Sequence, residues 1–258
     1  MTRYITCISG KGGAAKTTTS INLGAAFTYF GKDTTVIDAN LTTPNIGVHL
    51  GVPIVPINLN HVLQGKNHIS EAVYLHPIGT KIVPAGISIN ELKNTNPSNL
   101  RRVLRGLSGT TDIAIIDSAA GLGREALLAM ESGDEILIIT NPELPAITDA
   151  LKTIKVAEEL GKKIIGVVLT RTNMNDGDIS VKNVEAMLDK PVIAIIPEDK
   201  SVREALTMKD VVVYTHPKSG AAIEYKRLAA FLLGREYEDE NIDEGMFKKL
   251  LKRLKIVG

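Results

Sequence analysis

Residues 9–19 read Ser-Gly-Lys-Gly-Gly-Ala-Ala-Lys-Thr-Thr-Thr and directly follow the apolar run Tyr-Ile-Thr-Cys-Ile at residues 4–8. A strand that enters a glycine-rich loop closed by Lys-Thr is typical of a phosphate-binding loop. Successive loop N–H groups converge on the phosphates, and the following helix presents its positive N-terminus to them. In this pattern Lys16 reaches the β- and γ-phosphate oxygens and Thr17 gives its hydroxyl to Mg²⁺. The loop residues expected to contact the phosphates are Gly10, Lys11, Gly12, Gly13, Ala14, Ala15, Lys16, Thr17 and Thr18.

Ala15 stands immediately before the closing lysine, where such loops normally carry glycine. If the backbone at this position requires a positive φ, alanine costs roughly 1–2 kcal/mol. If the position is already helical, alanine costs nothing. The sequence leaves both possibilities open.

The rest of the chain alternates apolar runs with helical patterns, which predicts an α/β fold with a doubly wound, mostly parallel sheet flanked by helices. Most strand candidates are continuous Ile, Val and Leu runs, as expected for strands covered on both faces. The predicted strands are residues 4–9, 34–38, 81–84, 113–117, 135–140, 164–170 and 191–196. The predicted helices are residues 17–30, 98–107, 124–132, 145–160, 181–188, 201–208 and 220–233.

Three regions follow from the composition along the chain. Residues 1–234 are expected to form the nucleotide-binding domain, residues 235–245 an acidic linker, and residues 246–258 a basic amphipathic helix. The start of the first strand so close to residue 1 predicts that no signal peptide is present. No apolar run reaches the roughly 18 residues of a membrane span, so we expect a cytoplasmic protein.

The composition of the 258 residues narrows the function classes. The chain is 44% hydrophobic and has a net charge of +1, so it lacks the general basic surplus of many nucleic-acid-binding proteins, and we do not expect nucleic acid as a partner. Its single cysteine, Cys7, excludes an internal disulfide and an iron–sulfur or zinc site built from cysteines.

Two more predicted strands end in polar residues, and in such sheets ligands bind at the carboxyl ends of the strands. The second strand ends in Asp38, followed two residues later by Asn40; the run Ile-Ala-Ile-Ile at residues 113–116 ends in Asp117. Asp117 and Asp38 are candidates for the magnesium shell, together with Thr17. An asparagine can hydrogen-bond a water but cannot accept its proton.

The sequence Lys-Gly-Gly-Ala-Ala-Lys-Thr at residues 11–17 resembles the deviant phosphate loop of the MinD/ParA family of ATPases. Asp-Ser-Ala-Ala-Gly at residues 117–121 and Thr-Asn-Pro-Glu at residues 140–143 resemble two further segments of that family, although Ala119 replaces its usual proline. The similarity extends from residue 1 to about residue 234 and is strongest to the MinD-like cell-positioning members.

The resemblance implies an ATP-dependent homodimer with ATP and Mg²⁺ bound between the subunits, in which Lys11 reaches the partner's phosphates. The resemblance makes Lys11, Lys16, Asp38 and Asn40 the catalytic candidates. Asn40 stands where relatives carry a carboxylate that positions the attacking water. Because an amide replaces that carboxylate, ATP hydrolysis is expected to be slow. Gly121 would approach the γ-phosphate. Glu143 is either a contact across the dimer or a cap of the following helix. The base would meet Thr170, Arg171, Pro197 and Glu198.

The C-terminal segment has helical spacing with an apolar and a basic face, and resembles the membrane-targeting sequence of MinD. On an anionic bilayer each basic residue could add about 1 kcal/mol, and two tails in a dimer would bind through avidity. A helix docked on the core or on a partner is the alternative. The proposed membrane residues are Phe247, Lys248, Lys249, Leu250, Leu251, Lys252, Arg253 and Leu254.

The leading hypothesis is therefore a slow, MinD-like Mg-ATPase that lies at the inner face of the cell membrane in its ATP state, responds to an unidentified protein regulator, and positions cell division or another structure. The alternatives are a weakly or non-hydrolysing ATP-bound scaffold, and a ParA-like segregation or flagellar-number ATPase.

Overall fold

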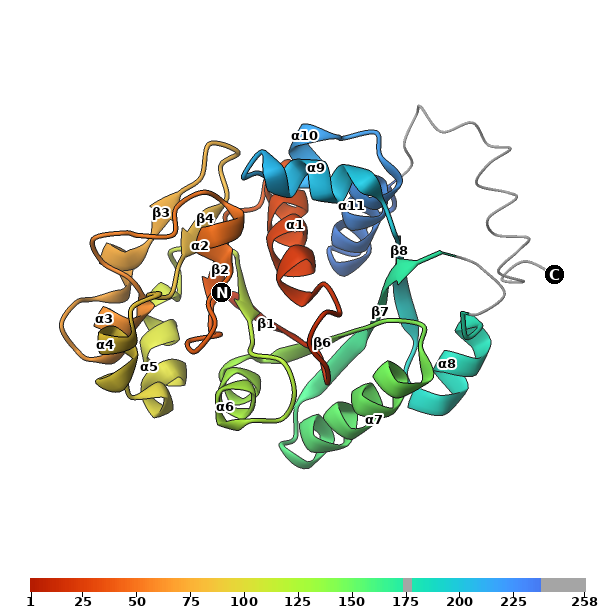
Figure 1. The fold of residues 1–258 in the computed structure, drawn as a ribbon, viewed down its shortest axis with the longest axis horizontal. Coiled ribbons are helices and arrows are strands. Elements are labelled where there is room, and N and C mark those ends of the chain that lie inside the picture. The colour runs from red at the N-terminus through yellow and green to blue at the C-terminus, as the bar shows by residue number, and fades with distance from the viewer. Residues whose placement is uncertain (174–177, 238–258) are drawn as a thin grey trace.

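The continuous apolar runs form the strands of one twisted sheet in the computed structural model, which describes residues 1–173 and 178–237 (Figure 1). Within these ranges eight strands lie in the order β3-β4-β2-β5-β1-β6-β7-β8, and only the β3–β4 pair is antiparallel. The predicted doubly wound, mostly parallel sheet is thus confirmed. The strands are β1 (Arg3–Ile8), β2 (Thr34–Asp38), β3 (Tyr74–Leu75), β4 (Lys81–Val83), β5 (Ile113–Asp117), β6 (Glu135–Thr140), β7 (Lys163–Thr172) and β8 (Val192–Pro197).

Helices cover both faces of the sheet (Figure 1). One face is packed by α1, α2, α9, α10 and α11, and the other by α3 and α5 to α8. The helices are α1 (Lys16–Tyr29), α2 (Ile46–His49), α3 (Leu59–Leu63), α4 (Ile89–Lys93), α5 (Leu100–Leu104), α6 (Arg124–Ser132), α7 (Leu144–Glu159), α8 (Val181–Leu188), α9 (Lys200–Thr207), α10 (Val212–Thr215) and α11 (Gly220–Leu232), with 3₁₀ turns η1 (Ile69–Ala72), η2 (Pro97–Asn99) and η3 (Arg105–Leu107). None of the helices within the described ranges is long and apolar enough to cross a bilayer.

The strand alternation divides the core into layers on either side of the sheet. Ile5 and Cys7 of β1 face α1 and α11, whereas Tyr4 and Ile8 face the opposite helices. Successive strand residues point to opposite faces, so a strand buried on both faces is apolar throughout. This is why the sequence predicted β5 and β6 from continuous apolar runs, and β1 from a run interrupted only by Thr6.

The segment between β2 and β4 differs most from the sequence prediction. It contains α2, α3, η1 and the two-residue β3, none of which was predicted. A helix of four or five residues is too short to display a 3.6-residue period, so its pattern cannot be told from that of a loop. The helix predicted over residues 98–107 is also divided, into η2, α5 and η3.

The C-terminal end of the described chain lies against the C-terminal end of α1. The ring of Tyr237 packs edge-on against Phe30, with ring centroids 5.6 Å apart. Residues 235–237, assigned to the acidic linker from sequence, therefore begin on the protein surface. The predicted basic helix, residues 246–258, lies outside the described residues.

Candidate nucleotide site

The loop between β1 and α1 lies at the carboxyl edge of the sheet, where β1, β2 and β5 end side by side. β2 and β5 are paired in register, with Asp38 opposite Asp117, and Cys7 of β1 pairs with Asp117 on the other side. The phosphate loop, Asp38 and Asp117 therefore converge, as the sequence predicted from the ends of the strands.

The loop backbone adopts the turn that a phosphate cradle needs. Gly13 has φ 85°, and Ala15, the residue before α1, has φ 54° and ψ 29°. The question left open by the sequence is settled: Ala15 is in the left-handed region, where an L-residue costs roughly 1–2 kcal/mol. Among residues 1–173 and 178–237, no acceptor is hydrogen-bonded to the N–H groups of residues 12–17.

Gly10, one of the loop residues expected to contact the phosphates, also has a packing role that the sequence did not reveal. A Cβ on this residue would overlap the backbone carbonyl of Asp149 in α7. Glycine is required here because the start of the loop passes directly against a helix backbone. Gly10 thus sets the position of the loop.

Asp117 is the centre of the polar network beneath the loop. Its buried carboxylate accepts hydrogen bonds from Lys16 Nζ at 2.9 Å, from Thr17 Oγ1 at 2.6 Å and from Ser20 Oγ at 2.9 Å. The sequence analysis missed Ser20, although its place four residues after Lys16 puts both on one face of α1. A carboxylate beside a threonine hydroxyl supplies the hard oxygen ligands that Mg²⁺ prefers.

Asp38 is fully buried and organises the loop that follows β2. One of its oxygens accepts hydrogen bonds from the backbone N–H groups of Asn45 and Ile46, at 2.8 and 2.9 Å. Burial, reinforced by the nearby charge of Asp117, raises the pKa of Asp38 to about 7 despite these donors. The carboxyl of Asp38 therefore changes charge near neutral pH.

Asn40 closes the same loop on itself. Its side-chain nitrogen donates to the carbonyl of Thr43 at 2.6 Å, and its side-chain oxygen accepts from the Thr43 hydroxyl at 3.1 Å. The neighbouring Thr42 hydroxyl donates to Glu125 at the start of α6. In this conformation the amide of Asn40 is thus engaged by the protein.

Gly121 lies directly against the start of the phosphate loop. Its φ is 79°, as expected for a residue that needs glycine, and its N–H donates to the carbonyl of Ser9 at 2.9 Å. In this conformation the N–H is engaged by the protein, and the approach of Gly121 to the γ-phosphate stays a prediction for the nucleotide-bound state. The segment would have to release Ser9 first.

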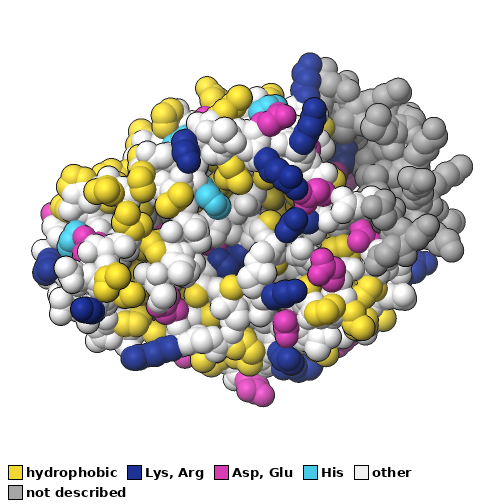
Figure 2. Space-filling model, in the orientation of Figure 1, with side chains coloured by type: hydrophobic (Ala, Val, Ile, Leu, Met, Phe, Trp, Pro, Cys, Tyr) yellow, Lys and Arg dark blue, Asp and Glu magenta, His cyan; other side chains and the backbone are white. Residues whose placement is uncertain are grey.

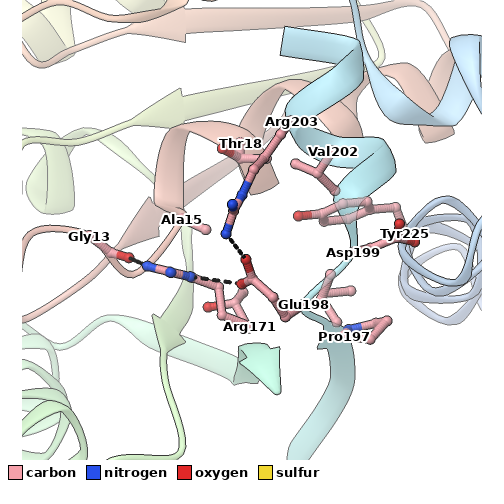
Figure 3. Close-up of a pocket in the computed structure, with 12 residues that line it drawn as sticks. Gly13, Ala15, Thr18, Arg171, Pro197, Glu198, Asp199, Val202, Arg203 and Tyr225 are labelled. Atoms are coloured by element: carbon pink, nitrogen blue, oxygen red, sulfur yellow. Dashed lines mark hydrogen bonds and ion pairs between the residues drawn. The ribbon is translucent and has the colours of Figure 1, made fainter. Parts of the chain in front are cut away.

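A pocket of about 260 Å³ lies beside the loop, between the ends of β7 and β8 (Figure 3). It brings together all four residues predicted at the base: Thr170, Arg171, Pro197 and Glu198. Residues from α9 and α11 also line it, among them Val202, Arg203 and Tyr225, which the sequence analysis missed. Val202 and Arg203 follow Glu198 closely in the chain, but their place in the pocket depends on how α9 begins; Tyr225 is far along the chain and is brought in by the packing of α11.

Two arginines hold Glu198 at the mouth of this pocket. Arg171 Nε and Arg203 approach its carboxylate at 2.9 and 2.8 Å, from the left and from above in Figure 3. The hydrogen bond from Arg171 is the main cause that lowers the pKa of Glu198; burial opposes it, and the hydrogen bond from Arg203 lowers the pKa further. An ionised Glu198 can accept a hydrogen bond from an exocyclic amine.

A second, smaller pocket of about 120 Å³ lies on the outer side of the loop. Lys11 and Glu143 line it together with Asn141 and Arg171. Glu143 occupies the residue before α7, but its side chain makes no capping hydrogen bond. The cap explanation for Glu143 therefore has no side-chain contact to support it.

A phosphate loop, a carboxylate that holds its lysine and threonine, and an adjacent base-sized pocket define a P-loop nucleotide-binding domain. Residues 5–212 match the model of the CobQ/CobB/MinD/ParA nucleotide binding domain. The chain belongs to this family, and the family predicted from its motifs is confirmed.

Similar proteins support the same assignment over nearly the whole chain. An uncharacterized ATP-binding protein of Methanocaldococcus jannaschii is 38% identical over 97% of this chain and 96% of its own length. The cell division ATPase MinD of Pyrococcus furiosus superposes with a TM-score of 0.88 at 33% identity, over 91% of this chain and 99% of that one. The septum site-determining protein MinD of Pyrococcus horikoshii, solved with Mg-ADP, gives a TM-score of 0.87 at 34% identity, over 90% and 96% of the two chains.

Proposed function

We propose that this protein is a MinD-like, Mg-ATP-dependent dimerisation switch that binds an anionic membrane in its ATP state and thereby positions cell division or another structure. The observation that carries the proposal is that two lysines of one loop have different surroundings. Lys16 is buried and paired with Asp117, whereas Lys11 is exposed in the outer pocket with Glu143. A lysine at the outer surface of the loop is suited to phosphates held by a second subunit.

ATP and Mg²⁺ are the ligands that we assign to the site. Lys16 and the loop N–H groups would hold the phosphates, Thr17 and Asp117 the metal with Asp38 behind them, and Arg171, Pro197 and Glu198 the base. The Mg-ADP bound to the Pyrococcus horikoshii relative supports this assignment. Mg²⁺ would neutralise charge on the phosphates when bound.

Hydrolysis is proposed to be slow because of Asn40. An amide at this position can orient a water but cannot take its proton, and here the amide also holds the loop closed through Thr43. The same observation favours a second candidate function, an ATP-bound scaffold that turns over very slowly or not at all. Both functions share the nucleotide-dependent dimer and the response to a protein regulator.

The membrane part of the proposal rests on residues 246–258, whose basic amphipathic pattern is a property of the sequence. Two tails in a dimer bind a surface far more tightly than one, so dimerisation by ATP would control location. On the face shown in Figure 2, Lys and Arg side chains are interspersed with Asp and Glu. We therefore propose a lipid surface reached through the tail, and not nucleic acid, as the extended anionic partner.

Co-sedimentation with anionic vesicles tests this function directly. The full chain and a form ending at Glu244 are each spun with vesicles in ATP–Mg²⁺ and in ADP–Mg²⁺, and the ATP-dependent dimer is followed in parallel by light scattering. We expect pelleting of the full chain in ATP only, and none of the shortened form. A dimer that forms in ATP but never pellets would remove the membrane role, and a chain that stays monomeric in ATP would remove the switch.

A further inference from the structure

Thr170, near the end of β7, reaches the phosphate loop from beneath. It is 1% exposed, and its hydroxyl oxygen lies 2.9 Å from the backbone carbonyl of Ala14, compared with 3.2 Å from the carbonyl of Thr140. A threonine hydroxyl has one proton to donate. The shorter contact makes the carbonyl of Ala14 its principal acceptor, and links β7 to the loop across more than half of the chain.

The peptide that Thr170 holds adjoins Ala15, which, like Arg171 in the same site, has a Cβ and a positive φ. Ala15 has φ 54° and ψ 29°, a conformation that is unfavourable for every residue with a Cβ. No side chain caps the start of α1 to compensate within the described residues. The strain must therefore be offset by contacts from outside the loop.

The carbonyl of Ala14 and the N–H of Ala15 belong to one peptide plane. In a trans peptide these two groups point in opposite directions, so a hydrogen bond that fixes the carbonyl also fixes the direction of the N–H. The Ala15 N–H is one of the loop donors without a protein acceptor among the described residues.

We propose that Thr170 is a positioning residue: its hydroxyl holds the Ala14–Ala15 peptide and keeps the loop in the left-handed turn that is competent to bind phosphate. This inference rests on the proposed nucleotide binding and gives Thr170 a role different from contact with the base. The apparent affinity for a ligand falls with the fraction of protein in the competent conformation. Without the hydroxyl, strain at Ala15 would lower that fraction.

A second substitution separates this role from a merely structural one. Ala15→Gly removes the penalty for positive φ, so the loop would no longer need support from Thr170. A lost contact with the base, in contrast, would not be restored by a change at Ala15. The two positions should therefore show an interaction in a double-mutant cycle.

The experiment measures the Kd for ATP–Mg²⁺ by calorimetry in the full chain and in five variants. Thr170→Val should weaken binding about fivefold, the equivalent of one net hydrogen bond, and Thr170→Ser should bind within about twofold of the original chain because it keeps the hydroxyl. Thr172→Val is the matched control, because Thr172 lies on the same strand and donates to Ile196 instead, and it should leave the Kd within about twofold.

Ala15→Gly alone should change the Kd by less than about twofold, yet in the Thr170→Val background it should recover most of the lost affinity. The inference is overturned if Thr170→Val binds normally, if Thr170→Ser fails to restore binding, or if Ala15→Gly has the same effect in both backgrounds. Failure of the original chain to bind ATP is a distinct outcome, since it would overturn the proposed function itself.

Discussion

Asp38→Asn is expected to change how the stability of the protein depends on pH. The folded protein raises the pKa of Asp38 to about 7 from its ordinary 3.8, mainly through burial and then through the charge of Asp117. A carboxyl with a raised pKa holds its proton in the folded state while the unfolded chain releases it. Its contribution to stability is therefore intact below about pH 4 and is lost as the pH rises through 7.

The size of the effect follows from those two pKa values. Between pH 5 and pH 7 the unfolded carboxyl is ionised, whereas the folded one is still largely protonated, so close to one proton separates the states. The free energy of unfolding should fall by about 2 kcal/mol over this interval on account of Asp38 alone. Asp38→Asn removes this pH-dependent contribution to the free energy of unfolding. Any weakening of the hydrogen bonds from Asn45 and Ile46 would shift the free energy of the variant by the same amount at every pH.

The assay is urea unfolding at pH 5, 6, 7 and 8 without nucleotide or magnesium. From pH 5 to pH 7 the free energy of unfolding of the original chain should fall by about 2 kcal/mol relative to that of Asp38→Asn. Asp134→Asn, an amide change at an exposed carboxylate paired with Arg105, is the control. Parallel curves for the original chain and Asp38→Asn would refute the reasoning.

Three further predictions concern the loop and its neighbours. Lys11→Ala should abolish the ATP-induced dimer in light scattering with little change in Tm, while Lys93→Ala at another exposed lysine should not; an unchanged dimer would disprove the role in trans. Asn40→Asp should raise ATP turnover about tenfold or more by supplying a general base, and an unchanged rate would show that another element limits hydrolysis. Ala15→Gly should raise Tm by about 2 °C, because relief of the positive φ exceeds the entropy that glycine adds to the unfolded chain; a lower Tm would mean that the turn is not strained.

Much of the fold could be predicted because the apolar pattern of each long helix and strand matches the faces that it buries in the folded protein. The predicted segments 124–132 and 181–188 coincide with α6 and α8, and 34–38, 113–117 and 135–140 with β2, β5 and β6. These strands lie inside a sheet covered on both faces, so their central residues are apolar and their polar residues lie at the strand ends, as do Thr34 and Asp38 in β2 and Glu135 in β6. The short α2, α3 and β3 carry too few residues to show any period, and their positions depend on contacts with the rest of the domain.

The family, the phosphate loop and the strand-end carboxylates could all be predicted from the amino-acid sequence, because each depends on residues adjacent in the chain: Lys11, Lys16 and Thr17 in one loop, and Asp38 and Asp117 each at the end of an apolar run. Which of these groups meet depends on the packing of the folded domain. It placed Ser20 on Asp117, Arg203 and Tyr225 at the base pocket, the Gly121 N–H on Ser9, and Thr170 beneath Ala14. Except for Arg203, which follows Glu198 closely in the chain, these pairings join segments far apart in sequence, and no local pattern encodes a contact that exists only once the sheet has formed and its helices have packed.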